Sequence, residues 1–265
     1  MRRHCLLSCL LFLWSLPAFA GAWLQPEGQG QFSNGYTYFR SDHYWDTNGD
    51  THTQPTFNKI EMQPWGEYGV TKWLTVGGDL YAQYDWQGGF SNWGVADPEL
   101  WARTKLWGNG NQLISIQPLV KLPSYFYAND LTPRGGSHST DEELSLLFGS
   151  SLHVLSDNDY TDMRVGYRWR NQGLKPQIKA DAALGISPWD HWLLVPAIRY
   201  VGSTGIDSSS FSESGDLDYR LLKAELGIIY KYNDGSWWQF TGFDHLDGKQ
   251  TGNGQGLYIG YGVKF

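Results

Sequence analysis

The last nine residues of the chain are Leu257-Tyr258-Ile259-Gly260-Tyr261-Gly262-Val263-Lys264-Phe265. Counted back from the terminal phenylalanine, every second residue is large and apolar, whereas the residues between are mostly small or polar. A period of two predicts a β-strand, because successive side chains of a strand point to opposite faces. The chain is therefore expected to end in a strand that separates an apolar environment from a different one.

The place of this strand in the chain is also informative. A final strand that ends on phenylalanine resembles the signal that bacterial outer-membrane β-barrels present to their insertion machinery, with Phe265, Val263 and Tyr261 as the signal residues. This resemblance implies the outer membrane of a Gram-negative bacterium. It also implies outer-membrane lipid, the barrel insertion machinery and periplasmic chaperones as partners.

The N-terminus predicts export. Arg2 and Arg3 precede an apolar run over residues 6–16, and Pro17-Ala18-Phe19-Ala20 fits a small-x-small cleavage site before Gly21. The run is about half of the roughly 20 apolar residues that a membrane-spanning helix needs. We therefore expect a secretory signal peptide at 1–20 and one barrel domain at 21–265. Both cysteines lie in the signal peptide, so the mature chain is expected to form neither disulfides nor thiol-based sites.

The composition fits a transmembrane barrel. The mean hydropathy is −0.44, yet the chain holds 14 Trp, 16 Tyr and 12 Phe. In such a barrel only alternate residues face lipid, and aromatic girdles mark both membrane interfaces. A secreted β-sandwich or a lectin-like domain is the competing interpretation. The net charge of −7 includes no basic block, so no nucleic-acid partner is expected.

The alternation divides the chain into segments that predict an all-β, antiparallel, up-and-down transmembrane barrel of about 12 strands, with 10 or 14 as alternatives. The predicted strands are 29–41, 57–69, 73–86, 97–107, 112–122, 143–155, 160–170, 175–186, 191–202, 218–232, 236–246 and 255–265. Short turns rich in Asn, Asp, Gly and Pro should face the periplasm. Longer loops should face outward, at 42–56, 87–96, 123–142, 203–217 and 247–254. Three prolines fall in the interior of predicted strands, where a bulge or a strand end would have to accommodate them: Pro64, Pro118 and Pro196.

The polar faces of these strands supply the candidate functional residues. Acids dominate the early strands and bases the later ones, so an acidic wall is expected to face a basic wall across the lumen. Such a transverse field favours polar, charged or zwitterionic solutes. The predicted lumen-lining residues are Glu61, Glu67, Asp79, Asp85, Glu99, Arg103, Lys105, Arg164, Arg168, Arg170, Lys179, Asp181, Arg199, Lys223 and Glu225.

These features predict a channel or transporter-like barrel for passive or gated passage of a small solute whose identity stays open. A plugged structural or adhesive barrel with binding loops is the alternative, since small barrels often fill their interiors with ion pairs. The aromatic loop at 123–142 either folds over the mouth or is an ordinary surface loop.

Motifs for catalysis and metal binding are weak. Asp46-Thr47-Asn48-Gly49-Asp50 resembles an acidic cation-binding turn but lacks the spacing of a calcium loop. Ser137-His138-Ser139 invites comparison with barrel phospholipases, a rim lipid hydrolase being the third hypothesis, but an orienting Asn and a Gly-x-Ser-x-Gly elbow are missing. His153 is expected to form hydrogen bonds in the lumen. The sequence thus predicts no enzyme, no cofactor and no metal site.

Short motifs along the chain resemble a family of small Gram-negative barrels. They are Gly21-Ala22-Trp23 with Pro26, Gly28 and Gly30, then Tyr36-Thr37-Tyr38, Tyr68-Gly69-Val70-Thr71 before Leu74-Thr75-Val76-Gly77, and Asp97-Pro98-Glu99-Leu100. The family is that of the outer-membrane meta-pathway phenol-degradation proteins, related to transporters of small organic molecules. The resemblance implies uptake or diffusion, with aromatic or hydrophobic solutes among the candidates. That expectation conflicts with a charged lumen and leaves the solute open.

Overall fold

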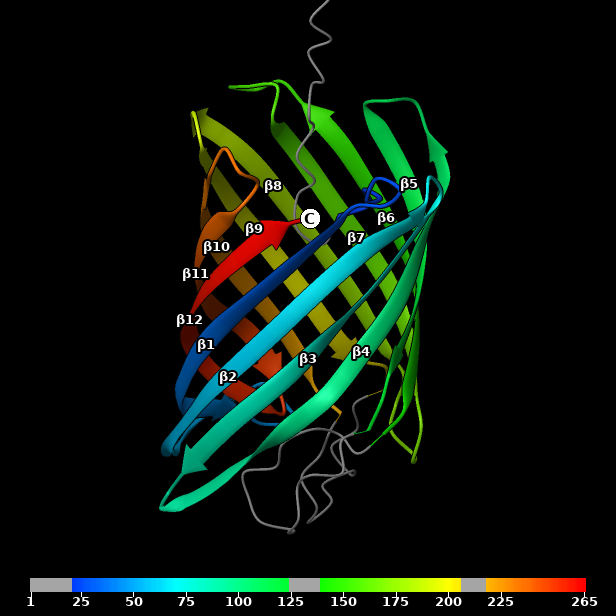
Figure 1. Cartoon of the computed structure of the whole chain (residues 1–265). Coiled ribbons are helices and arrows are strands. Elements are labelled where there is room, and N and C mark those ends of the chain that lie inside the picture. Colours follow the sequence, from blue (N-terminus) through cyan, green and yellow to red (C-terminus); the bar gives the residue numbers. More distant parts are fainter. Residues whose placement is uncertain (1–20, 124–138, 206–217) are drawn as a thin grey trace, which may run out of the picture.

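The computed structural model describes residues 21–123, 139–205 and 218–265, which form a closed barrel of twelve antiparallel strands (Figure 1). Each strand pairs with its neighbours in sequence, and β12 pairs with β1. The predicted class and strand number are therefore confirmed. The strands are β1 (Gly30–Trp45), β2 (Thr51–Thr71), β3 (Leu74–Gln87), β4 (Phe90–Gly108), β5 (Gln112–Lys121), β6 (Asp141–Leu152), β7 (Asp159–Arg170), β8 (Gln177–Trp189), β9 (Trp192–Ser203), β10 (Arg220–Lys231), β11 (Trp237–Lys249) and β12 (Thr251–Lys264).

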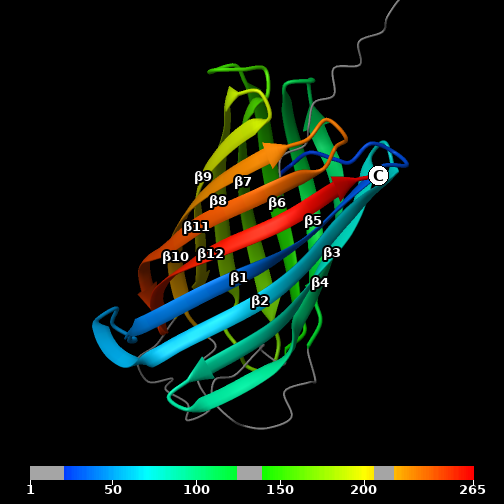
Figure 2. The ribbon, with the colours of Figure 1, turned by 60° about the vertical axis from the view of Figure 1, so that its left-hand side comes forward.

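The C-terminal strand closes the barrel, as its alternation suggests. β12 lies between β1 and β11 along its length (Figure 2). Its pairing with β1 runs from Trp45↔Thr251 to Gln31↔Lys264. Phe265 extends this ladder, because its N–H donates to the carbonyl of Gly30 at 2.9 Å. We call the end of the barrel that contains Gly30 and Phe265 the terminal end.

Three of the predicted long loops are wrong. The residues at 42–56, 87–96 and 247–254 belong mostly to paired strands, so β3 and β4 are joined only by Gly88 and Gly89, and β11 and β12 only by Gln250. Both glycines have positive φ, 57° and 89°, as a two-residue hairpin turn requires. The segments at 42–56 and 247–254 show no sustained apolar alternation, and the backbone ladder needs none once a strand has passed beyond the apolar band. The segment at 87–96 differs, because its Phe90, Trp93 and Val95 are exposed. Most of the predicted loops at 123–142 and 203–217 lies outside the described residues.

The prolines within strands lie where hydrogen bonding lapses. Pro64, Pro118 and Pro196 each remain paired on one side. On the other side the ladder shows no pairs between the flanking positions, at 62–65 of β2, 116–119 of β5 and 194–197 of β9. A proline has no N–H to donate, so these gaps accommodate it within a closed sheet.

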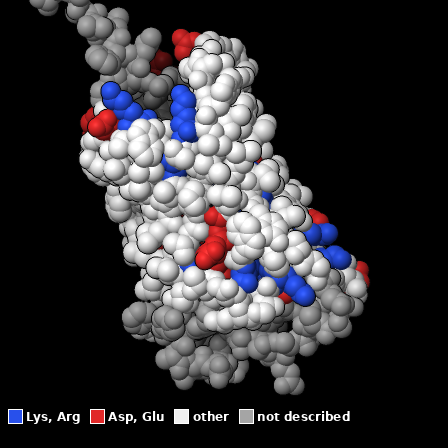
Figure 3. Space-filling model, turned by 90° about the vertical axis from the view of Figure 1, so that its right-hand side faces the viewer, with Lys and Arg blue, Asp and Glu red and all other residues white. Residues whose placement is uncertain are grey.

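The barrel exposes apolar side chains and buries polar ones. On β7, Met163, Val165 and Trp169 are exposed, whereas Arg168 is buried, and on β3 Leu80 is exposed. The face shown in Figure 3 is mostly uncharged, and its charged side chains form small separate groups. This distribution is the reverse of a water-soluble barrel and is typical of a lipid-facing wall. Among the described residues no helix is long and apolar enough to span a membrane.

Candidate functional site

The lumen contains a cavity of about 950 Å³. The residues that line it come from β1–β3 and β8–β12, together with Tyr219 just before β10. We call this part of the barrel the cavity side, and the part formed by β4–β7 the packed side. The charged residues that line the cavity are Lys59, Glu61, Asp79, Asp85, Lys179, Arg199, Lys223 and Glu225.

Two aspartates on β3 give the cavity an acidic face. Asp79 accepts a hydrogen bond from the Tyr81 hydroxyl at 3.0 Å, and Asp85 accepts one from Gln83 Nε2 at 3.0 Å. The second carboxylate oxygen of each, Oδ1, has no hydrogen-bond partner in the described structure. Both of these oxygens are buried, so the two aspartates give the face its acidic character without presenting the free oxygens to the lumen.

Opposite charges come from β9 and β10. Arg199 Nε lies 2.7 Å from Glu225 Oε2, and Lys223 Nζ lies 2.6 Å from Glu225 Oε1. One glutamate thus lies between two cations, and the Arg199 side chain is 39% exposed. This face is net positive and partly open to solvent, so it can attract anionic groups.

The cavity also has an aromatic surface. The Phe39 ring stacks on Phe243 with centroids 6.2 Å apart and lies against Phe57 and His245. Lys223 Nζ lies 4.9 Å from the centroid of the Phe243 ring. The apolar surface and the positive face therefore adjoin.

On the packed side, charges neutralise one another. Arg168 of β7 contacts Glu143 of β6 at 2.8 Å and Glu99 of β4 at 2.5 Å. β4 and β7 are separated by two strands, so this second contact is made through the barrel interior. Lys179 of β8 also reaches Glu143, at 3.2 Å. The Arg168 and Glu143 side chains are 6% and 0% exposed, which places them in a buried network.

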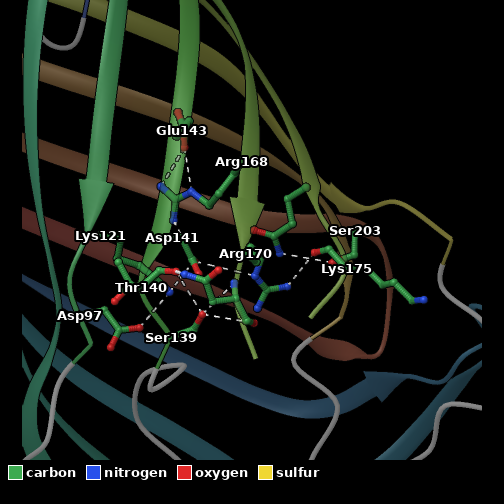
Figure 4. Close-up of polar contacts among 12 residues, drawn as sticks. Asp97, Lys121, Ser139, Thr140, Asp141, Glu143, Arg168, Arg170, Lys175 and Ser203 are labelled. Atoms are coloured by element: carbon green, nitrogen blue, oxygen red, sulfur yellow. Dashed lines mark hydrogen bonds and ion pairs between the residues drawn. The ribbon is translucent and has the colours of Figure 1, made fainter. Parts of the chain in front are cut away.

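A second set of ion pairs lies at the end of the packed side away from the terminal end. Lys121 of β5 contacts Asp97 at 3.0 Å and Asp141 at 2.7 Å. Arg170 contacts Asp141 at 3.8 Å and Asp218 at 3.1 Å. Figure 4 shows Asp97, Lys121, Asp141 and Arg170 close to Arg168 and Glu143. This group fills the interior beside β4–β7.

At the terminal end, the chain itself enters the barrel. Residues 21–29, which we call the N-terminal segment, run across this end as the dark-blue loop in Figure 1. The carbonyls of Ala22 and Trp23 accept hydrogen bonds from Ser115 Oγ at 2.5 Å and Arg103 Nη1 at 2.7 Å. Gln25 donates to Glu67 Oε1 at 2.5 Å and, from its backbone N–H, to Thr75 Oγ1 at 2.8 Å. The segment thus narrows the lumen.

Two apolar clusters reinforce this narrowing. Ala22 packs with Leu113 and Leu147, and Trp23 contacts the same cluster. A second cluster consists of Tyr160, Leu193, Ile229 and Trp237, which come from β7, β9, β10 and β11. The second cluster explains why the sequence of β9 is apolar on both faces: one face meets lipid and the other fills the interior.

The structure places the predicted lumen residues in three groups. Seven line the cavity: Glu61, Asp79, Asp85, Lys179, Arg199, Lys223 and Glu225. Two contact the N-terminal segment, Glu67 and Arg103, which also pair with each other at 3.2 Å. Five are in ion pairs outside those groups: Glu99, Arg164, Arg168, Arg170 and Asp181. Lys105 is exposed, near the terminal end of β4.

The expected opposition of an acidic and a basic wall is therefore modified. Basic residues of β7 and β8 contact acidic side chains directly. We therefore expect the transverse electric field between acidic and basic walls around the cavity and not on the packed side. The predicted lumen residues do not include Lys121, Asp141, Asp162 or the N-terminal segment. Glu143 is also absent from the predicted lining, although its alternation with Leu144 is sufficient to place it on the inner face.

Two further predictions concern the rims. His153 follows the end of β6, lies 3.8 Å from Asp157 and has a 62% exposed side chain, so it forms no lumen hydrogen bond with the described residues. Of the Ser137-His138-Ser139 triplet, only Ser139 lies within the described residues.

The acidic turn between β1 and β2 is held by its own hydrogen bonds. Asp46 Oδ1 accepts from the backbone N–H groups of Asn48, Gly49 and Asp50. The hydrogen bond from His52, followed by these backbone donors, lowers the pKa of Asp46 below its ordinary value. Within the described ranges, no group of three or more His, Cys, Asp or Glu residues has a metal-binding arrangement.

Comparison with known proteins supports the fold. No protein-family model matches the chain, and no curated protein sequence matches it. Among solved structures, the COG4313 outer membrane channel from Pseudomonas putida F1 superposes with a TM-score of 0.74 at 13% identity, covering 94% of this chain and 100% of that one.

Two more distant barrels superpose less well. The NanC porin gives a TM-score of 0.56 at 8% identity, covering 88% of this chain and 100% of that one. The CymD monoaromatic hydrocarbon channel gives 0.51 at 10% identity, covering 91% of this chain and 89% of that one. The chain thus has the fold of outer-membrane barrels.

Proposed function

We propose that this protein is an outer-membrane channel that passes a small polar or charged solute through the cavity side of its lumen. The observation that carries the proposal is a cavity of about 950 Å³ inside a lipid-facing barrel, lined by acids on one side and bases on another. Charged groups that stay hydrated in a lumen can replace part of a solute's hydration shell. The N-terminal segment, at the end that would face the periplasm, is the constriction of this path.

We also propose how the protein is exported and inserted into the outer membrane. A signal peptide at 1–20 directs export, and the strand that ends at Phe265 presents the insertion signal to the assembly machinery. The exposed apolar band then contacts outer-membrane lipid, as a transmembrane barrel requires.

The chemistry of the cavity favours solutes that carry both charges. An ammonium group matches the acidic face that Asp79 and Asp85 give the cavity, and an anionic group matches Arg199 and Lys223. The aromatic surface around Phe39 and Phe243 provides a place for a ring or a short apolar part. The CymD channel is named for monoaromatic hydrocarbons, and an apolar solute is the alternative that its likeness suggests.

Single-channel recording from the refolded mature protein in a planar bilayer tests the proposal. We expect discrete conductance steps and a reversal potential that shifts under a salt gradient. Asp79→Lys should move selectivity toward anions and Arg199→Glu toward cations. Lys72→Glu is the matched control, because Lys72 is an exposed turn residue outside the cavity.

The contrary result is also informative. Absence of conductance steps from protein whose folding is verified by heat modifiability would remove the aqueous path. The plugged barrel with binding loops would then be the better account. Liposome swelling with glycine and with uncharged solutes of similar size would further test the preference for zwitterions.

A further inference from the structure

A buried carboxylate at the terminal end forms no ion pair within the described part of the chain. Asp162, the fourth residue of β7, is 6% exposed. Its Oδ1 accepts the backbone N–H of Ala22 at 3.0 Å, but its Oδ2 has no hydrogen-bond partner among the described residues. A carboxylate removed from water is strongly unfavourable unless a cation or several donors compensate it. The described structure leaves this requirement half satisfied.

Gly21 lies directly against the free oxygen. A methyl group added to its Cα would overlap Oδ2 and Cγ of Asp162, so only glycine fits at this approach. Gly149 of β6 and Ala183 of β8 pair with Asp162, so the positions on either side of it carry small residues. The backbone of Gly21 is therefore held beside a buried carboxylate oxygen that a positive charge would compensate.

The sequence supplies that charge at the same residue. Pro17-Ala18-Phe19-Ala20 predicts cleavage between Ala20 and Gly21. Hydrolysis of this peptide bond consumes one water and leaves a carboxylate on Ala20 and an amino group on Gly21. A free α-amino group has a reference pKa of about 7.7–8.0, so most of it is ammonium at neutral pH. Before cleavage, the same nitrogen is a neutral amide.

We propose that the α-ammonium group of Gly21, created by removal of the signal peptide, is the ion-pair partner of Asp162 and fastens the N-terminal segment inside the lumen. Processing thereby completes the constriction. The ammonium pairs with Oδ2 while the next residue, Ala22, donates to Oδ1, so one carboxylate holds two consecutive backbone nitrogens. The ion pair stands independently of the channel activity, whereas its effect on conductance rests on the proposed function.

Reactivity of the N-terminal amine tests the pair. Mature protein with Gly21 as its first residue is refolded and treated at neutral pH with an amine-reactive reagent, and labelling is followed by peptide mass spectrometry. We expect Gly21 to react at least about tenfold more slowly than in the Asp162→Asn variant, because a charge-assisted hydrogen bond sequesters the ammonium. Asparagine keeps the size of the side chain and its acceptor for Ala22.

A second variant keeps the test decisive if Asp162→Asn does not fold. Mature protein with one additional serine before Gly21 moves the ammonium away from Oδ2 without altering the barrel. We expect fast labelling of this serine and, in bilayers, more frequent opening than in the unextended chain. Equal labelling rates in the unextended chain and in either folded variant would overturn the ion pair. Slow labelling of Gly21 together with an absence of conductance in all three proteins would retain the pair and remove the channel.

Discussion

The packed side and the cavity side use similar charged residues in different environments. Arg168 on the packed side contacts two glutamates and is 6% exposed, whereas Arg199 on the cavity side contacts Glu225 and Asp181 and is 39% exposed. Arg168 also lies 3.9 Å from Asp141, so each arginine contacts more than one carboxylate. The difference is that the Arg199 side chain is partly exposed to solvent, whereas the Arg168 side chain is buried.

This contrast teaches how one barrel combines stability with a polar path. Charges that are fully removed from water must be paired with good geometry, and the pairs then act as a structural interior. Charges that remain hydrated contribute little to stability and are free to interact with a solute. The same substitution should therefore lower the free energy of unfolding much more on the packed side than on the cavity side.

The largest expected effect is on the packed side. Arg168→Met should lower the free energy of unfolding by about 3–5 kcal/mol, because Glu99 and Glu143 would remain buried without their main cation. Arg199→Met, the same change on the cavity side, should cost less than about 1 kcal/mol. Urea unfolding in lipid, followed by heat-modifiable migration or tryptophan fluorescence, measures both. Equal losses would show that the distinction between the two sides is wrong.

The sequence predicted the barrel well because alternation is a local property. In β7 the pattern of Met163, Val165, Tyr167 and Trp169 against arginines assigns each side chain to a face without any knowledge of distant residues. Strand number and the assignment of inner faces follow from repeating this reasoning. The polar strand ends, such as His43 paired with Thr53, were missed because backbone pairing beyond the apolar band has no hydrophobic signature.

The division of the lumen into two sides could not be predicted in the same way. Contact between Arg168 and Glu99 depends on how far side chains reach across a curved interior, and alternation carries no such information. The N-terminal segment was also missed, because residues 21–29 have no alternation and their position depends on partners far along the chain. Asp162 is one of these, 140 residues from Ala22.

A second expected effect concerns the support of the N-terminal segment. Leu147 is 1% exposed and packs against Ala22, so Leu147→Ala should cost about 2–4 kcal/mol. It should also loosen the segment and raise the frequency of channel opening. Leu221→Ala is the matched control, since Leu221 lines the cavity and is only partly buried. Unfolding and bilayer recordings on both variants compare the two positions, and unchanged opening in Leu147→Ala would argue against a constriction at this point.

Ion selectivity should show the reverse order: a substitution on the cavity side should change it more than one on the packed side. Asp79→Asn removes a cavity carboxylate and should lower the cation-to-anion permeability ratio by about twofold or more. Glu143→Gln removes a carboxylate that is enclosed by Arg168 and Lys179, so it should destabilise the barrel and leave selectivity nearly unchanged. Reversal potentials under a salt gradient measure this ratio. A larger shift in Glu143→Gln than in Asp79→Asn would place the conducting path on the packed side.

The smallest expected effect is in the turn between β1 and β2, which belongs to neither side of the lumen. The hydrogen bond from His52 and the backbone donors lower the pKa of Asp46, so the ionised form stabilises the turn above the ordinary aspartate pKa of 3.8. That stabilisation is lost as the pH falls below this value and through the lowered pKa of the folded state. Amide hydrogen exchange at Asn48, Gly49 and Asp50 should therefore lose protection in this range, after correction for the intrinsic rate.

Asp46→Asn should remove the pH dependence and leave conductance unchanged. A change in conductance would mean that this turn contacts the solute path, and the cavity side would then extend to the rim.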